Sequence, residues 1–89
     1  MKRIALYAGS FDPFTRGHAD IVSRGLDLFD EVIVAIGTNE AKRNLYTAEQ
    51  RQQQISCYYA DQPRVRIVVY TGLTVTLAQE LSAHVLLRG

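Results

Sequence analysis

Four short apolar segments alternate along this chain with three segments of helical spacing, and the alternation limits the folds open to it. The apolar segments are Arg3–Ala8, Glu31–Gly37, Val65–Tyr70 and Val85–Leu87. The helical patterns cover His18–Leu28, Thr47–Tyr59 and Leu73–Ala83. Strands and helices in this order form a parallel sheet through right-handed crossovers. The sequence therefore predicts an α/β fold, a Rossmann-like doubly wound parallel sheet with four strands and three crossover helices.

Local signals indicate where two of the helices begin. Thr47 to Gln50 has the form of a capping box, with Thr47 at the N-cap and the Gln50 side chain reaching back. We also expect Thr74 to be the N-cap of the third helix. If the first strand lies between the second and the fourth, its carboxyl end is the topological switch point, where ligands of such sheets bind.

Composition indicates one globular domain over residues 1–89. The chain is 47% hydrophobic and 21% charged, and its formal net charge is +1 with the charges dispersed, so we expect no nucleic-acid partner. The single cysteine, Cys57, excludes an intrachain disulfide and a multi-cysteine metal site, and fits the cytoplasm. The sequence contains no signal-peptide core and no apolar run of spanning length, so we expect no membrane association.

The loop after the first strand, Gly9–His18, has the composition of an anion-binding turn. Gly9 and Gly17 permit close backbone approach, Pro13 stiffens the loop, and a helix that begins near Thr15 presents free N–H groups. The same residues could instead serve only to turn the chain between strand and helix. Neither the Walker pattern nor G-x-G-x-x-G is present, so the generic phosphate motifs do not decide between these interpretations.

The order of residues in this loop resembles a known signature. Gly9-Ser10-Phe11-Asp12-Pro13 followed by Thr15-Arg16-Gly17-His18 is similar to the nucleotidyltransferase superfamily that carries a (His/Thr)-x-Gly-His motif, and within it to the phosphopantetheine adenylyltransferases. Lys42, Leu73-Thr74 and Leu87-Arg88-Gly89 also fall where that family has them. The resemblance implies an enzyme of coenzyme A biosynthesis that transfers the adenylyl group of ATP to 4′-phosphopantetheine, giving dephospho-coenzyme A and pyrophosphate.

The resemblance also implies roles for single residues. It assigns ATP binding to Ser10, Phe11, Gly17, His18 and Gly89. It assigns binding of the acceptor to Ser10, Lys42, Leu73, Thr74 and Arg88. His18 is the expected catalytic residue, donating a hydrogen bond to the α-phosphate during in-line attack, since this reaction needs mainly alignment and neutralisation of charge. Mg²⁺ is expected to arrive with ATP, because no carboxylate cluster suggests a dedicated metal site.

Two further residues of the chain are interpreted without a catalytic role. Asp12 is expected to form a turn with the backbone ahead of Pro13, because the nucleophile is already anionic and needs no base. His84 belongs to no motif, and we expect it to be structural.

Members of the family continue well past Gly89, so we expect the chain to be the N-terminal half of such an enzyme, with the activity of these 89 residues alone left open. Complete members are typically hexamers, which implies a homo-oligomer. Exposed Val85 and Leu87 on the last strand also predict association. Two other functions stay open: a cytidylyltransferase of the same superfamily, which would prefer CTP, and a non-catalytic nucleotide-binding module, which would release no pyrophosphate.

Overall fold

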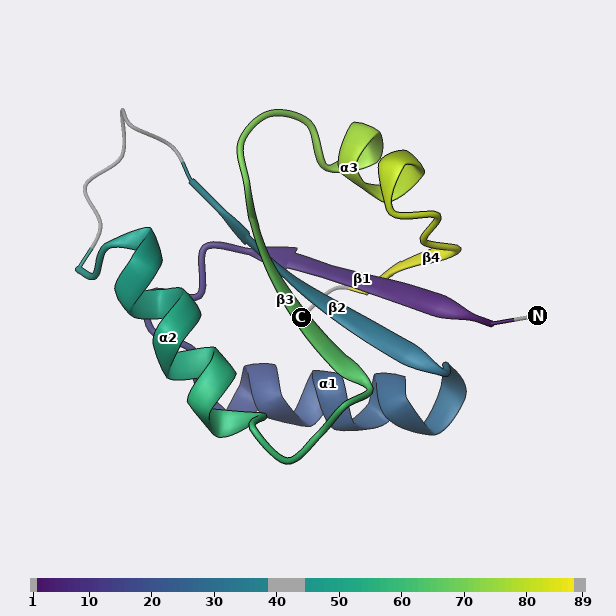
Figure 1. Ribbon diagram of the computed structural model, residues 1–89, viewed down its shortest axis with the longest axis horizontal. Coiled ribbons are helices and arrows are strands. Elements are labelled where there is room, and N and C mark those ends of the chain that lie inside the picture. Colours follow the sequence, from purple (N-terminus) through teal and green to yellow (C-terminus); the bar gives the residue numbers. More distant parts are fainter. Residues whose placement is uncertain (1, 39–44, 88–89) are drawn as a thin grey trace.

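A computed structural model describes residues 2–38 and 45–87 of the chain. The elements follow the predicted order: β1 (Ile4–Gly9), α1 (Arg16–Leu28), β2 (Glu31–Gly37), α2 (Ala48–Tyr58), β3 (Val65–Tyr70), α3 (Thr74–Glu80) and β4 (Val85–Leu87) (Figure 1). Neighbouring strands are parallel throughout, and their order across the sheet is β3-β2-β1-β4. The prediction of a doubly wound parallel sheet is confirmed, and the condition that the first strand lies between the second and the fourth is met.

Strand β2 is one of the two inner strands of the sheet, and its residues Val32 to Ile36 are all fully buried. A strand covered on both faces needs apolar side chains on both, which explains why its sequence is a continuous apolar run instead of an alternating one. In β1, Leu6 pairs with Ile33 of β2 on one side and with Leu86 of β4 on the other. Strand β1 therefore lies between β2 and β4 as far as Tyr7, and its last residues, Ala8 and Gly9, pair with β2.

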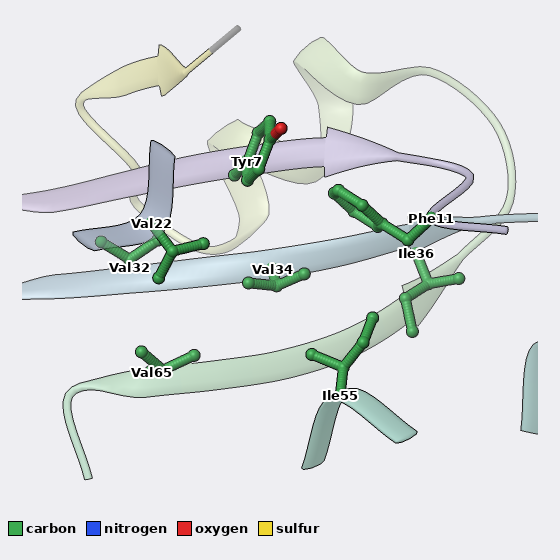
Figure 2. Close-up of a cluster of buried hydrophobic side chains, with 8 residues drawn as sticks. All are labelled: Tyr7, Phe11, Val22, Val32, Val34, Ile36, Ile55 and Val65. Carbon is green, nitrogen blue, oxygen red and sulfur yellow. The ribbon is translucent and has the colours of Figure 1, made fainter. Parts of the chain in front are cut away.

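Helices cover both faces of the sheet. The α1/α2 face carries a buried cluster to which α1 contributes Val22 and α2 contributes Ile55; its members are Tyr7, Phe11, Val22, Val32, Val34, Ile36, Ile55 and Val65 (Figure 2). The α3 face has a smaller buried set, Leu6, Ile33 and Ala35, with partly buried Leu77, Ala78 and Leu81 of α3 and the turn after it packed against them. Figure 1 shows α1 and α2 on one side of the sheet and α3 on the other.

Helix α1 begins at Arg16 with Thr15 as its N-cap, so the predicted start near Thr15 is confirmed. Two predicted details of α3 differ from the structure. Helix α3 is shorter than predicted: it ends at Glu80, with Leu81 as its C-cap, and the following Ser82 has a left-handed φ of 56°. Thr74 is not the N-cap of α3, because that position is held by Leu73.

The prediction for the last strand was wrong in part. Val85 is 41% exposed, as expected, and Leu86 is 39% exposed. Leu87, however, is partly buried and packs against the cluster of the α1/α2 face. Its Cδ1 atom lies over Gly25 of α1, where the missing side chain makes room for it.

In residues 2–38 and 45–87, no helix combines the length and the apolar character that crossing a membrane demands.

Candidate active site

An open cavity of about 660 Å³ lies at the carboxyl end of β1, between that strand and the start of α1. Its walls come from β1, the loop after it and the first turns of α1: Tyr7, Ala8, Gly9, Ser10, Phe11, Asp12, Pro13, Thr15, Gly17, His18 and Ile21. Four residues predicted from the sequence, Ser10, Phe11, Gly17 and His18, therefore share one cavity. Its position agrees with the rule that open parallel sheets bind ligands at the topological switch point.

Phe11 offers this cavity its backbone, because its ring belongs to the core. The residue is 3% exposed, and the ring lies edge-on to Tyr7 and His18, with centroid distances of 5.1 and 5.0 Å. A φ of 48° turns the chain sharply at Phe11, in the left-handed region that residues other than glycine seldom adopt. A Cβ on Gly9 would lie 3.2 Å from the Phe11 ring, so glycine there permits this close packing.

His18 is oriented by the start of its own helix. The backbone N–H of Thr15 donates to Nδ1 of His18 at 2.9 Å, and the Thr15 hydroxyl lies 3.1 Å from the same nitrogen. Because a backbone N–H can only donate, Nδ1 acts as an acceptor and the neutral ring carries its proton on Nε2. Burial among aromatic rings lowers the pKa of His18 from its ordinary 6.5, which also favours the neutral form.

The start of α1 adds backbone donors to the same cavity. The first intrahelical bond runs from the Ala19 N–H to the Thr15 carbonyl, so the N–H groups of the preceding turn make no such bond to the helix. A Cβ on Gly17 would meet nothing closer than the Thr15 hydroxyl at 3.7 Å. Packing against the described residues therefore does not require glycine at this position, and its missing side chain leaves the helix end open toward the cavity. An anion is favoured there by the N–H groups and by the helix dipole.

Asp12 lies in a turn, as the sequence predicts, and its side chain also bonds to a distant segment of the chain. Its two carboxylate oxygens accept hydrogen bonds from the backbone N–H groups of Leu45, at 2.7 Å, and Tyr46, at 2.9 Å. These residues precede α2, so Asp12 ties the loop after β1 to the segment that leads into α2. The bonds cross more than thirty positions, and no local pattern indicates them.

Two other predicted residues, Leu73 and Thr74, do not line this cavity. Leu73 lines a groove of about 390 Å³ between the end of β3 and α3, and Thr74 lines another of about 310 Å³ between α3 and β4. Ala8 borders both the Thr74 groove and the first cavity, so these two lie back to back at β1. Lys42, Arg88 and Gly89 lie outside the described residues.

Sequence reasoning missed Arg51, which is 1% exposed and donates to the Ser10 carbonyl at 2.6 Å. A signal was present in the sequence: Arg51 stands four residues before Ile55 and four after the N-cap Thr47, on the buried stripe of α2. A charged residue on such a stripe needs buried polar partners.

Carboxylate, histidine and cysteine side chains do not gather in threes anywhere in the described part of the chain, so no metal cage is visible there. Among the described residues, Asp12 is the one carboxylate on the cavity wall, and both of its oxygens already accept backbone N–H groups.

The sequence of this chain is similar to proteins of known name. The profile of the cytidylyltransferase-like family matches residues 6–89. "Phosphopantetheine adenylyltransferase" of Porphyromonas gingivalis is 61% identical over 88 residues, covering 99% of this chain and 58% of the relative. The protein of that name from Flavobacterium johnsoniae is 46% identical and covers 98% of this chain and 57% of the relative. The chain thus spans a little over half the length of these relatives.

Solved structures give the same fold. A bifunctional NMN adenylyltransferase/ADP ribose pyrophosphatase from Francisella tularensis superposes with a TM-score of 0.72 at 26% identity, over 92% of this chain and 27% of that one. A lipopolysaccharide core biosynthesis protein from Thermoplasma volcanium superposes with a TM-score of 0.73, over 97% of this chain and 73% of that one; at 18% identity it supports the fold alone. With its sheet order, its cavity at the end of β1 and the profile match over residues 6–89, the chain belongs to the cytidylyltransferase-like family.

Proposed function

We propose that this chain carries the nucleotide site of an enzyme that transfers the adenylyl group of ATP to 4′-phosphopantetheine. The observation that carries the proposal is the fixed orientation of His18 at the wall of the cavity. Because Nδ1 accepts the Thr15 N–H, the Nε2–H group on the far side of the ring is the donor left for a ligand.

The residues of the cavity suit phosphoryl chemistry. In such a transfer, a phosphate oxygen of the acceptor attacks the α-phosphorus of ATP and pyrophosphate leaves from the opposite side. The attacking oxygen is already anionic, so the protein contributes alignment and stabilisation of charge. We assign the triphosphate to the Ser10–Phe11 backbone, Gly17 and the start of α1, and the α-phosphate to Nε2–H of His18.

The remaining assignments rest on the resemblance. Lys42 and Arg88 would hold the phosphate of the acceptor, Leu73 and Thr74 its pantetheine arm, and Gly89 a part of ATP. In the fold, the grooves lined by Leu73 and Thr74 lie on the α3 side of β1, the side away from α1. An acceptor reaching both grooves and the first cavity would cross the end of β1 near Ala8.

Magnesium is proposed as a companion of ATP. The cavity wall fits a metal that is bound by the triphosphate, because the Asp12 oxygens are engaged by backbone donors. When bound, Mg²⁺ would neutralise phosphate charge. The protein groups proposed here would orient the phosphates without coordinating the ion.

Two other functions are separated from this proposal by one assay. The names of the relatives favour adenylyl over cytidylyl transfer, and a binding module would hold nucleotide without turnover. The assay measures pyrophosphate released from ATP or CTP with Mg²⁺ and 4′-phosphopantetheine. It uses the 89-residue chain and a chimera in which this chain replaces the matched segment of the Porphyromonas gingivalis relative. Release from ATP in the chimera supports the proposal, whereas release only from CTP, or nucleotide binding without release, contradicts it.

Two substitutions at His18 test its role. His18→Asn can keep an acceptor near the Nδ1 position, preserving the bond from Thr15, but it cannot reach the Nε2 position. His18→Gln can extend an amide N–H toward the Nε2 position but does not hold the acceptor in place. Losing one donor to a developing oxyanion costs about 10²–10³ in kcat. We therefore expect His18→Asn to lower kcat by about that factor, with a smaller effect on KM, and His18→Gln to retain more activity. An effect confined to KM would move His18 to ground-state binding.

We also propose a cytoplasmic homo-oligomer, a hexamer by resemblance to complete members. Exposed apolar side chains support association: Leu28 is 61% exposed and Leu73 is 74% exposed. Sedimentation of the chimera tests this, and a monomer at micromolar concentration would contradict it.

A further inference from the structure

Arg51 is the one charged side chain that is buried among the described residues. It lies on α2, one turn before Ile55, in the stripe that packs against the sheet. The recorded ion pairs join Lys2 and Arg66 to Glu31, and Arg24 to Asp20, so Arg51 is paired with none of those carboxylates. Burial of a cation is costly unless polar groups surround it, which raises the question of what this guanidinium does.

The contacts of Arg51 join three segments of the chain. Nη1 donates to the carbonyl of Ser10 at 2.6 Å and makes a longer contact, 3.4 Å, with the carbonyl of Gly37 at the end of β2. Nε donates to the carbonyl of Thr47, the N-cap of α2, at 3.3 Å. The shortest of these bonds goes to the loop that lines the cavity. Figure 1 shows that this loop passes beside α2 on its way from β1 to α1.

The Ser10 carbonyl shares a planar peptide with the N–H group of Phe11. In a trans peptide the C=O and N–H bonds point in opposite directions, so holding the oxygen also fixes the direction of the N–H. Arg51 holds the oxygen on the α2 side of the loop, and Arg51 is not part of the cavity wall, whereas Ser10 and Phe11 are. The N–H group of Phe11 is therefore directed away from Arg51.

The same peptide precedes a residue with an unfavourable backbone conformation. The φ of Phe11 is 48°, which costs energy for a side chain of this size. Such a conformation persists only where neighbouring contacts hold it. The Arg51 bond on one side and the packing of the Phe11 ring against Tyr7 and His18 on the other provide those contacts.

We infer that Arg51 is a positioning residue for the anion site: it holds the Ser10–Phe11 peptide so that the Phe11 N–H faces the bound phosphates. The inference rests on the proposed function, since it requires that the cavity bind a nucleotide triphosphate. Arg51 also places a positive charge beneath the loop, in a buried position where salt screens it little. It contacts no ligand and is not itself catalytic.

The test compares ATP binding by four proteins: the unchanged chain, Arg51→Lys, Arg51→Met and the control Gln54→Met. Gln54 is an exposed position on the same helix. Each protein is titrated with ATP while the ¹⁵N–¹H signal of the Phe11 amide is followed by NMR, and circular dichroism establishes which variants are folded. A purely structural role would alter stability but leave the ATP-dependent shift of the Phe11 signal in every folded variant.

We expect Arg51→Met to weaken ATP binding at least about tenfold and to abolish the Phe11 shift, because a charge-assisted bond is lost. Arg51→Lys should fall between it and the unchanged chain, and Gln54→Met should match the unchanged chain. A folded Arg51→Met protein with unaltered affinity and an unaltered Phe11 shift would overturn the inference. So would failure of both Arg51 variants to fold, which would make the guanidinium a folding requirement. If neither the unchanged chain nor the chimera binds ATP, the proposed function fails, and that result is distinct from the others.

Discussion

The two faces of the sheet differ in how deeply the side chains of their helices are buried. On the α1/α2 face, both helices insert a fully buried side chain, Val22 or Ile55, into a cluster of eight buried residues. On the α3 face, the helix contributes no fully buried residue, and Leu73 and Val75 at its start are 74% and 60% exposed. The cavity that contains His18 lies over the first face, and the grooves of Leu73 and Thr74 lie on the second.

This difference matches the demands of the proposed chemistry. Groups that stabilise developing charge must be held in place before the substrate arrives, because reorganisation during the reaction would cost free energy. The loop after β1 is held from three sides: by the Phe11 ring in the core, by Arg51 at Ser10 and by the N–H groups before α2 that donate to Asp12. The start of α3 has no comparable set of buried contacts.

The largest effect should come from truncating one core residue on each face. Ile55→Ala removes a fully buried side chain between α2 and the sheet, and we expect it to lower the free energy of unfolding by about 3 kcal/mol. Leu77→Ala, on α3, truncates a side chain that is only partly buried, so the loss should be about 1 kcal/mol. Urea denaturation of both variants measures the difference.

Tyr58→Ala serves as the control, since Tyr58 is on α2 but 66% exposed. It should lower the free energy of unfolding less than Ile55→Ala does. The difference would show that the loss depends on burial and not on a position in α2. Equal losses of unfolding free energy for Ile55→Ala and Leu77→Ala would show that the two faces are packed equally well.

A smaller effect should separate two glycines of α1. At Gly25 an added Cβ would lie 2.9 Å from Cδ1 of Leu87 and 3.0 Å from Cγ2 of Val32, so Gly25→Ala should cost about 1 kcal/mol net of the gain in helix propensity. At Gly17 the added Cβ meets no tight contact, so Gly17→Ala should keep or slightly raise the stability. If phosphates occupy the space over Gly17, the same variant should bind ATP more weakly.

Thermal unfolding and an ATP titration test both halves of that expectation. A stable Gly17→Ala protein with unchanged ATP affinity would remove Gly17 from the proposed site. A Gly25→Ala protein as stable as the parent would show that Leu87 and Val32 shift at little cost.

The sequence predicted the fold well because the fold depends on local patterns. The apolar runs indicated the strands, and the capping box at Thr47 is present, with the Gln50 N–H bonded to the Thr47 hydroxyl at 3.1 Å. The predicted members of the first cavity are neighbours in the chain, so Ser10, Phe11, Gly17 and His18 could be grouped from one motif. Their binding roles remain predictions.

What sequence could not supply are the contacts between distant segments. The bond from Arg51 to Ser10 spans 41 positions and the bond from Leu45 to Asp12 spans 33, and each depends on where the folded sheet brings α2. The separation of Leu73 and Thr74 from the His18 cavity has the same origin: the chain passes to the other face of the sheet before α3. The spacing of Arg51 from Ile55 could have indicated that Arg51 is buried, but it could not have indicated that Ser10 is its partner.

The smallest effect concerns pH and compares a histidine on each side of the molecule. Burial lowers the pKa of His18 below 6.5, so between the lowered value and 6.5 the unfolded chain binds more protons than the folded one. The free energy of unfolding must then rise with pH in that window. The part of the free energy of unfolding that comes from the lowered pKa of His18 is fully present above pH 6.5. It is lost as the pH falls toward the lowered pKa.

His18→Gln should flatten this part of the stability profile, measured by urea denaturation between about pH 5.5 and 8, above the range in which ordinary carboxylates titrate. His84→Gln is the matched control: Nδ1 of His84 also accepts a backbone N–H, from Ile4 at 3.2 Å, but this residue lies between α3 and β4. That variant should keep the slope, because His18 is unchanged in it. A slope that survives in His18→Gln and disappears in His84→Gln would assign the titration to the α3 side. That result would contradict the explanation that burial keeps the His18 ring neutral.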